Sequence, residues 1–149
     1  MYPSPFAEPR TDAERAVAER VAAGGVEVVT FWAPWCGNSL SQLDRVYPSA
    51  VEAHPEVGFT FVGLWNGGAS GADVLRERGV PERARALGQP GVGQDAPKEE
   101  RDARFLGLPV TWIPTTWVFR GGQLATAFNY GEVTREQLDD AIAGARSGW

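Results

Sequence analysis

Cys36 is the only cysteine in this chain of 149 residues, and Ser39 follows it three residues later. A cysteine thiolate attacks disulfides, so a thiol held in its ionised form would carry out thiol–disulfide exchange. A hydroxyl cannot attack a mixed disulfide, so Ser39 cannot release a substrate from Cys36. We expect Cys36 to be the nucleophile. The alternative is a purely structural role, in which Cys36 is a small buried hydrophobic residue.

Three interpretations are open for Ser39. Its hydroxyl would donate a hydrogen bond to the sulfur of Cys36 and stabilise the thiolate. It would cap a helix, which is a common role of serine at a helix start. Alternatively, an engineered change has replaced a cysteine of the natural protein by serine.

The segments around Cys36 predict where the thiol lies. Residues 26–32 are a nearly unbroken run of β-branched and aromatic side chains, typical of a central strand buried on both faces. A turn follows, and we predict a helix that starts around residues 38–40 and is kinked or ended by Pro48. Residues 57–65 predict the next strand. Cys36 would then lie at a helix N-terminus, where free backbone N–H groups and the helix dipole favour a thiolate.

The flanking segments complete a fold prediction. Thr11 and Glu14 form a capping box that opens a first helix, and Thr134 and Gln137 form another that opens a last helix running through Ala145. Two strands, at 115–119 and 123–128, are joined by a glycine turn into a hairpin. The sequence therefore predicts the α/β class, with a central mixed sheet flanked by helices and a βαβ half that precedes a ββα half.

The weakest region of the prediction is residues 66–104, which glycines interrupt repeatedly. We predict one short helix near residues 72–78 and a solvated helical face over 99–104. The region is interpreted as an insertion between the two halves, which either covers a site or runs over the surface. One domain is expected over residues 1–149, with residues 1–10 as a lead-in.

Two motifs resemble the thioredoxin-like superfamily. Phe31-Trp32-Ala33-Pro34-Trp35-Cys36-Gly37 resembles the active-site stretch of that family, and Trp112-Ile113-Pro114-Thr115-Thr116 resembles its cis-proline loop. The insertion between them is similar to that of the extracytoplasmic thioredoxin-like reductases of cytochrome maturation. The resemblance implies a thioredoxin-like fold with a cis bond between Ile113 and Pro114.

The resemblance also implies a set of site residues. Cys36 and Ser39 would form a monothiol Cys-x-x-Ser catalytic pair, and the loop would bind an extended substrate through the backbone of Ile113. The substrate-binding residues that follow from the two motifs are Trp35, Gly37, Asn38, Ile113, Pro114 and Thr115. Trp65, Trp112 and Trp117 are expected to be packing residues.

The chain departs from the family pattern at three positions besides Ser39. Asn38 stands where the family usually has a proline, Thr30 where it often has a buried acid, and Asp44 where it has a helix proline. These departures argue against a general dithiol reductase. The Cys-Gly-x-Ser spacing also resembles monothiol glutaredoxins, but Trp35 precedes it where that family has a basic residue that binds glutathione.

Composition limits the partners. The net charge of −5 comes from mixed-sign stretches without a basic patch, which argues against nucleic acid or an anionic membrane surface as a partner. One cysteine and one histidine argue against a metal site. No signal peptide or membrane-spanning run is recognised, so we expect a cytoplasmic monomer.

Two functional hypotheses follow. In the first, Cys36 exchanges with the disulfides of proteins or small molecules, and glutathione or another external thiol recycles it, with no bound cofactor. In the second, the thioredoxin-like fold is a non-catalytic module that binds peptides or proteins. The sequence leaves open whether the chain is an enzyme, because fold alone does not fix function.

Overall fold

The computed structural model describes residues 6–129 and 131–147. Residues 1–5 of the expected lead-in, on which the expectation of no signal peptide partly rests, lie outside the described residues. Five strands form one sheet in the order β3-β2-β1-β6-β7, and two very short strands, β4 and β5, pair separately. The elements are α1 Asp12–Ala22, β1 Val26–Trp32, α2 Gly37–Ala53, β2 Gly58–Gly63, α3 Ala72–Glu77, β3 Arg85–Gly88, the 3₁₀ turn η1 Lys98–Glu100, β4 Arg104–Phe105, β5 Leu108–Pro109, β6 Thr115–Arg120, β7 Gln123–Phe128 and α4 Arg135–Ser147.

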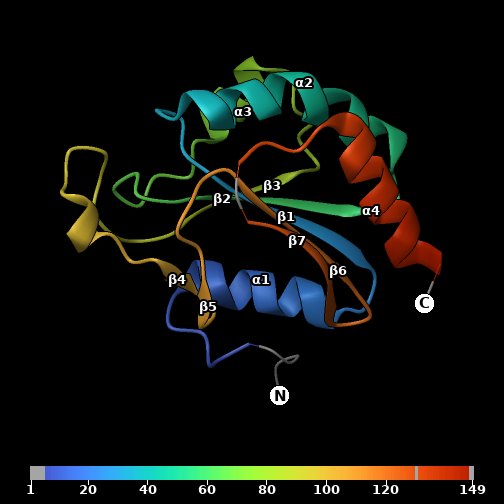
Figure 1. Ribbon diagram of the computed structural model, residues 1–149, viewed down its shortest axis with the longest axis horizontal. Helices are drawn as coiled ribbons and strands as arrows, with labels where there is room; N and C mark the ends of the chain where they lie inside the picture. The colour runs from blue at the N-terminus through green and yellow to red at the C-terminus, as the bar shows by residue number, and fades with distance from the viewer. Residues whose placement is uncertain (1–5, 130, 148–149) are drawn as a thin grey trace.

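The sheet is mixed, as predicted. β1 pairs in parallel with β2, and β2 with β3, whereas β6 runs antiparallel to β1 and to β7. Helices α2, α3 and α4 cover one face of the sheet, and α1 with the β4–β5 pair covers the other (Figure 1). The α/β class with a central sheet flanked by helices is therefore confirmed.

β1 is the central strand, and its side chains divide between two hydrophobic clusters. Val28 and Trp32 belong to the cluster under α2 and α4, while Val29 and Phe31 belong to the cluster over α1. This division follows from the alternation of side chains along a strand. Both faces of β1 are buried, which is why its sequence is continuously apolar rather than alternating.

Helix α2 differs from its prediction at both ends. It begins at Gly37 with Cys36 as the N-cap, and it continues through Pro48 to Ala53. Pro48 removes one backbone hydrogen bond, but Ala50 and Val51 beyond it are completely buried. The packing of this last turn maintains the helix, so of the two effects predicted for Pro48, a kink or an end, the end was wrong.

The two predicted capping boxes have different outcomes. At α4, Gln137 N–H donates to Thr134 Oγ1 and Thr134 N–H donates to Gln137 Oε1, as predicted. At α1, Glu14 N–H donates to Thr11 Oγ1, but the Glu14 carboxylate accepts from Arg10 N–H instead of from Thr11. Half of the first box was therefore wrong.

Glu14 instead joins distant segments. Its side chain is completely buried, and it also accepts hydrogen bonds from Leu106 N–H at 3.0 Å and Gln89 Nε2 at 3.3 Å. Burial alone would raise the pKa of Glu14, but the hydrogen bonds from Arg10 and Leu106 hold it below its ordinary value. The ionised carboxylate thus stabilises the packing of α1 against segments that come much later in the chain.

Residues 66–104 are more than an insertion. The predicted short helix is confirmed as α3, but the segment also supplies β3, which extends the main sheet beside β2. The helical face predicted over 99–104 was wrong, because the segment holds only the turn η1 and then extends into β4. The sequence of β3, Arg-Ala-Leu-Gly, is too short and too poor in β-branched residues to predict a strand.

Candidate active site

Cys36 lies where the carboxyl end of β1 turns into α2. It is the N-cap of α2, with φ −95° and ψ 117°, and its side chain is half-buried. The N–H groups of the first helical turn have no partner within the helix, so they favour negative charge at this position. The thiol donates a long, weak hydrogen bond to the carbonyl oxygen of Ile113 at 3.8 Å. The nucleophile predicted from sequence therefore lies against the loop predicted to face it.

Ser39 lies below the thiol in the first turn of α2. Its side chain is 1% exposed, and its Oγ accepts a hydrogen bond from Ala33 N–H at 3.3 Å. Side chains in a helix point back towards its N-terminus, which directs Ser39 to the turn before Cys36. Among the described residues Ser39 forms no hydrogen bond to the Cys36 sulfur and none to the first-turn amides, so neither expected bond is present in this structure.

The loop that contacts Cys36 is held from below. The Ile113–Pro114 peptide bond is cis, and both residues are buried. Thr115 is 1% exposed, and its hydroxyl donates to the carbonyl oxygen of Trp112 at 2.6 Å. Thr115 was predicted to bind substrate, and in this structure its side chain is buried and holds the loop, so any contact with a substrate would be through its backbone.

A cavity of about 320 Å³ opens beside the thiol. Of the predicted site residues, it brings together Trp35, Cys36, Asn38 and Ile113, whereas Gly37, Ser39, Pro114 and Thr115 do not line it. The residues that the sequence did not assign to the site are Trp65, Lys98, Arg101, Ala103, Thr111 and Trp112. The segment 66–104 thus reaches the site, which favours the covering role among its two interpretations.

Trp112 was predicted to be a packing residue, and this was wrong. It is 51% exposed, the largest exposed hydrophobic side chain among the described residues, and it lines the cavity next to Ile113. Trp65 and Trp117 are buried, as predicted, at 7% and 2% exposure. The sequence does not distinguish the exposed tryptophan from the two buried ones, because each of the three has apolar neighbours in the chain.

The guanidinium of Arg101 lies over two of the aromatic rings of the cavity. Its guanidinium carbon is 5.3 Å from the ring centre of Trp35 and 4.9 Å from that of Trp65. The rings are themselves fixed, because Trp35 Nε1 donates to the carbonyl oxygen of Trp65 and Trp65 Nε1 donates to that of Asp102. No sequence pattern could predict this arrangement, since it requires the segment 66–104 to return to the end of β1.

A neutral polar network that includes Thr30 underlies the site. Thr30 and Tyr47 share a hydrogen bond of 2.6 Å between their hydroxyls, and Gln42 Nε2 donates to the Tyr47 and Thr116 hydroxyls at 2.8 and 3.0 Å. Gln42 Oε1 accepts from Val133 N–H at 3.0 Å. Complete burial raises the pKa of Tyr47, so its phenol stays neutral. This network fixes α2 against β6 and the segment before α4 without supplying a proton-transfer carboxylate.

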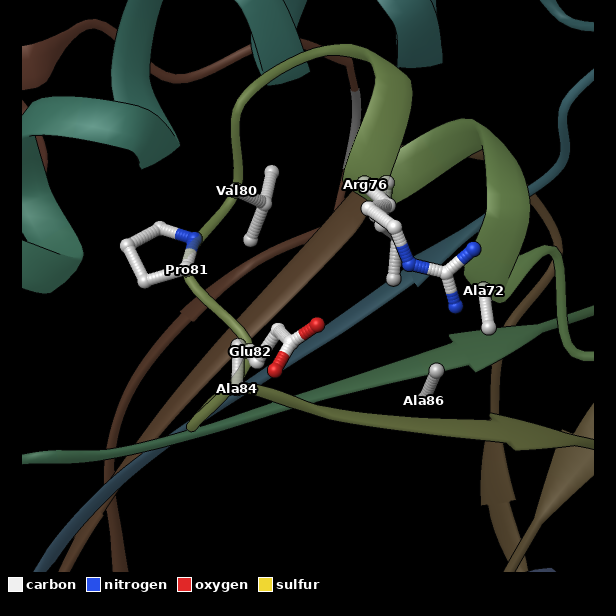
Figure 2. Close-up of a pocket in the computed structure, with 8 residues that line it drawn as sticks. Ala72, Arg76, Val80, Pro81, Glu82, Ala84 and Ala86 are labelled. Carbon is white, nitrogen blue, oxygen red and sulfur yellow. The ribbon is translucent and has the colours of Figure 1, made fainter.

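A second cavity, of about 290 Å³, lies between α3 and the outer strand β3 (Figure 2). Its lining is mostly alanine, valine, leucine and proline, with one basic and one acidic side chain, Arg76 and Glu82. It shares no lining residue with the cavity at Cys36. In the described ranges, no helix is long and apolar enough to span a membrane, and no group of three or more potential ligands is placed to hold a metal ion.

Comparisons with known proteins agree with this geometry at the level of the fold. No protein-family model and no curated protein matches the sequence. Solved structures do match. A secreted disulfide oxidoreductase of Mycobacterium tuberculosis, homologous to E. coli DsbE, has a TM-score of 0.59 and 14% identity over 85% of both chains.

Two other solved structures are similar. A DsbF homologue from Corynebacterium diphtheriae has a TM-score of 0.57 and 17% identity, covering 80% of this chain and 71% of its own. A thioredoxin-family thiol:disulfide interchange protein from Chlorobium tepidum has a TM-score of 0.56 and 17% identity, covering 85% and 83%. The sheet order, the thiol at the start of α2 and these neighbours together establish that the chain has the thioredoxin-like fold.

Proposed function

We propose that the protein carries out thiol–disulfide exchange with Cys36 as its single nucleophile and an external thiol as the recycling agent. The observation that carries this proposal is the position of Cys36. Cys36 is the N-cap residue of α2, and its half-buried thiol lines an open cavity and contacts the loop at Ile113. A helix N-terminus and partial exposure are the conditions under which a cysteine is reactive.

The exchange needs two steps. In the first, the Cys36 thiolate attacks one sulfur of a substrate disulfide, a bond forms between the two sulfurs, and the other substrate sulfur leaves as a thiolate. In the second, an external thiolate attacks the mixed disulfide and Cys36 leaves as a thiolate. Ser39 takes no covalent part, because an alcohol does not displace a thiolate from a disulfide.

The residues around the thiol have supporting roles in this proposal. Trp35 and Ile113 give the cavity beside Cys36 apolar surface, and Asn38 adds an amide to its lining. Gly37 lies in the first turn of α2 with no heavy atom near its Cβ position, which leaves space for a substrate to approach the sulfur. Thr115 and Ser39 hold the loop and the turn in place.

The test compares the thiol of the folded protein with that of the protein unfolded in urea. We expect the folded protein to form a mixed disulfide with 2-hydroxyethyl disulfide faster than the unfolded chain at pH 7, with the adduct located on Cys36 by mass spectrometry. Cys36→Ala abolishes the adduct, while the control variant Arg45→Gln, an exposed position on α2, retains it. A folded-state rate equal to or below the unfolded rate contradicts the proposal.

A peptide-binding module without turnover is the second candidate, and the exposed Trp112 favours it. This indole lies beside Ile113 at the rim of the cavity, where it would contact an extended chain. Binding of an extended peptide that is unchanged by Cys36→Ala but lost with Trp112→Ala supports this candidate. Peptide binding that is lost with Cys36→Ala contradicts the binding module and favours the exchange reaction.

A further inference from the structure

We propose that the cavity beside Cys36 recognises a low-molecular-weight thiol that carries carboxylate groups, and that Arg101 and Lys98 pair with those carboxylates. This inference rests on the proposed exchange reaction and names the substrate class of the same site. It depends on three observations, which are the charge of the cavity, the orientation of Arg101 and the size of the space.

The charge of the cavity opposes that of the chain. The chain has 19 acidic and 14 basic residues, with a net charge of −5. The cavity is lined by two basic residues, Lys98 and Arg101, and by no acidic residue. Concentrated positive charge in an apolar-walled cleft raises the local concentration of anions and the rate at which they arrive. The cavity therefore favours a small anion, although the chain as a whole is acidic.

Arg101 lies against two aromatic rings, and within the part of the chain that the structure describes no acidic side chain forms a salt bridge with it. Its side chain lies against Trp35 and Trp65, and its Nε is buried without a hydrogen-bond partner among the described residues. The Arg101 side chain as a whole has no hydrogen-bond or salt-bridge partner in the described ranges, so its guanidinium is available to an incoming anion. The neighbouring acid is already engaged, because the Asp102 carboxylate accepts from Arg10 Nη2 at 2.9 Å and from Arg104 N–H at 3.1 Å.

A guanidinium presents several N–H donors in one plane and pairs with a carboxylate through two of them. Lys98 adds a more mobile charge at an exposed position on the same cavity. The acids next to Lys98 in the chain, Glu99 and Glu100, are exposed and do not line the space. The volume of about 320 Å³ is at the lower end of the range for small-molecule sites, which suits a thiol of a few residues or less.

The chemistry balances with the anionic thiol as the only co-reactant. The Cys36 thiolate attacks the anionic half of a mixed disulfide, becomes disulfide-bonded to it and releases the other half as a thiolate. A second molecule of the anionic thiol, as its thiolate, then attacks the anionic half and leaves with it as a symmetrical disulfide, while Cys36 returns as a thiolate. In sum, one mixed disulfide and one free anionic thiol become one substrate thiol and one symmetrical disulfide, so one molecule of the anionic thiol is oxidised for each substrate sulfur reduced.

The experiment measures the rate at which Cys36 reacts with three disulfides that differ in charge. The probes are 3,3′-dithiodipropionate, which is anionic, 2-hydroxyethyl disulfide, which is neutral, and cystamine, which is cationic. Each rate is divided by the rate of N-acetylcysteine amide with the same probe, which corrects for the leaving group. We expect the corrected rate for the anionic probe to exceed that for the cationic probe by about tenfold or more, and to fall as salt is added.

Variants locate the effect. Arg101→Gln and Lys98→Gln should each reduce the preference for the anionic probe, and Arg120→Gln, at an exposed position that does not line the cavity, should leave it unchanged at the same change in net charge. Arg101→Gln could perturb the packing of Trp35 and Trp65. Lys98 is exposed, so Lys98→Gln tests the charge of the cavity without changing that packing. Equal corrected rates for the three probes, with Cys36 still faster than in the unfolded chain, overturn the anion site and leave the exchange reaction standing. No enhanced reaction with any probe overturns both.

Discussion

Replacing Gln42 by leucine should destabilise the protein by about 2–4 kcal/mol, although the two side chains are similar in size. Gln42 is 1% exposed and forms three hydrogen bonds, to the Tyr47 hydroxyl, the Thr116 hydroxyl and Val133 N–H. Tyr47 keeps its bond to Thr30 in the variant, but Thr116 and the Val133 amide lose the partner that Gln42 supplies. Each buried polar group left unpaired costs about 1–3 kcal/mol, and the apolar leucine side chain offsets part of the sum.

The assay is equilibrium unfolding in urea, followed by far-ultraviolet circular dichroism. The matched control is Gln123→Leu at an exposed position in β7, which should change the free energy of unfolding by no more than about 0.5 kcal/mol. A loss below about 1 kcal/mol in Gln42→Leu would refute the reasoning, because it would mean that Thr116 and Val133 find other partners. The same variant should also alter the reactivity of Cys36, since Gln42 fixes α2 against the strand that follows the cis bond.

Two further predictions concern buried side chains. Glu27 in β1 is 4% exposed, accepts a hydrogen bond from the Thr60 hydroxyl, and has its Oε1 3.5 Å from Arg20 Nε. Burial raises the pKa of Glu27 above the ordinary value of 4.5 in spite of these partners. A raised carboxyl pKa stabilises the fold while the group is protonated, so this contribution is lost as the pH rises above about 4.5. Glu27→Gln should therefore be more stable than the wild type at pH 7 but not at pH 4. Equal stability differences between the two proteins at the two pH values would contradict this. Trp117→Ala should lower the free energy of unfolding in urea by about 3–5 kcal/mol, because the buried Trp117 packs edge-on against Phe31 with ring centres 4.6 Å apart. Trp112→Ala, at an exposed position, should change it by about 0.5 kcal/mol or less. A similar decrease in both variants would mean that Trp112 is buried in solution.

The elements near Cys36 could be predicted from sequence because local patterns determine them. The apolar run of β1 needs burial on both faces, and the reciprocal box at Thr134 and Gln137 satisfies backbone groups within one turn. Pro48 shows where local rules fail. The penalty of a proline inside a helix is real, but the burial of the residues after it outweighs that penalty in the assembled fold.

The cavity could be predicted only in part. Trp35, Cys36, Asn38 and Ile113 belong to two motifs that the fold brings together around one cavity, and their role in binding a substrate stays a prediction. Arg101 and Lys98 come from a segment whose path depends on β3 pairing with β2 and on Glu14 binding Leu106 N–H. Such contacts between distant parts of the chain leave no periodic pattern in the sequence. For the same reason the partner of Ser39, an amide in the preceding turn, could not be told from the two partners expected for it.

The pairing of β1 with β6 has a consequence for how the protein is made. Val29 lies opposite Trp117, and Cys36 lies against Ile113. Neither contact can form until the later residue of each pair has left the ribosome. During synthesis the β-branched edge of β1 is therefore unpaired on one side, and unpaired apolar strand edges are prone to aggregate. The nascent thiol also lacks its neighbours from the cis-proline loop and from the segment that carries Arg101. The reactivity of Cys36 should therefore mature only after the last third of the chain has been translated.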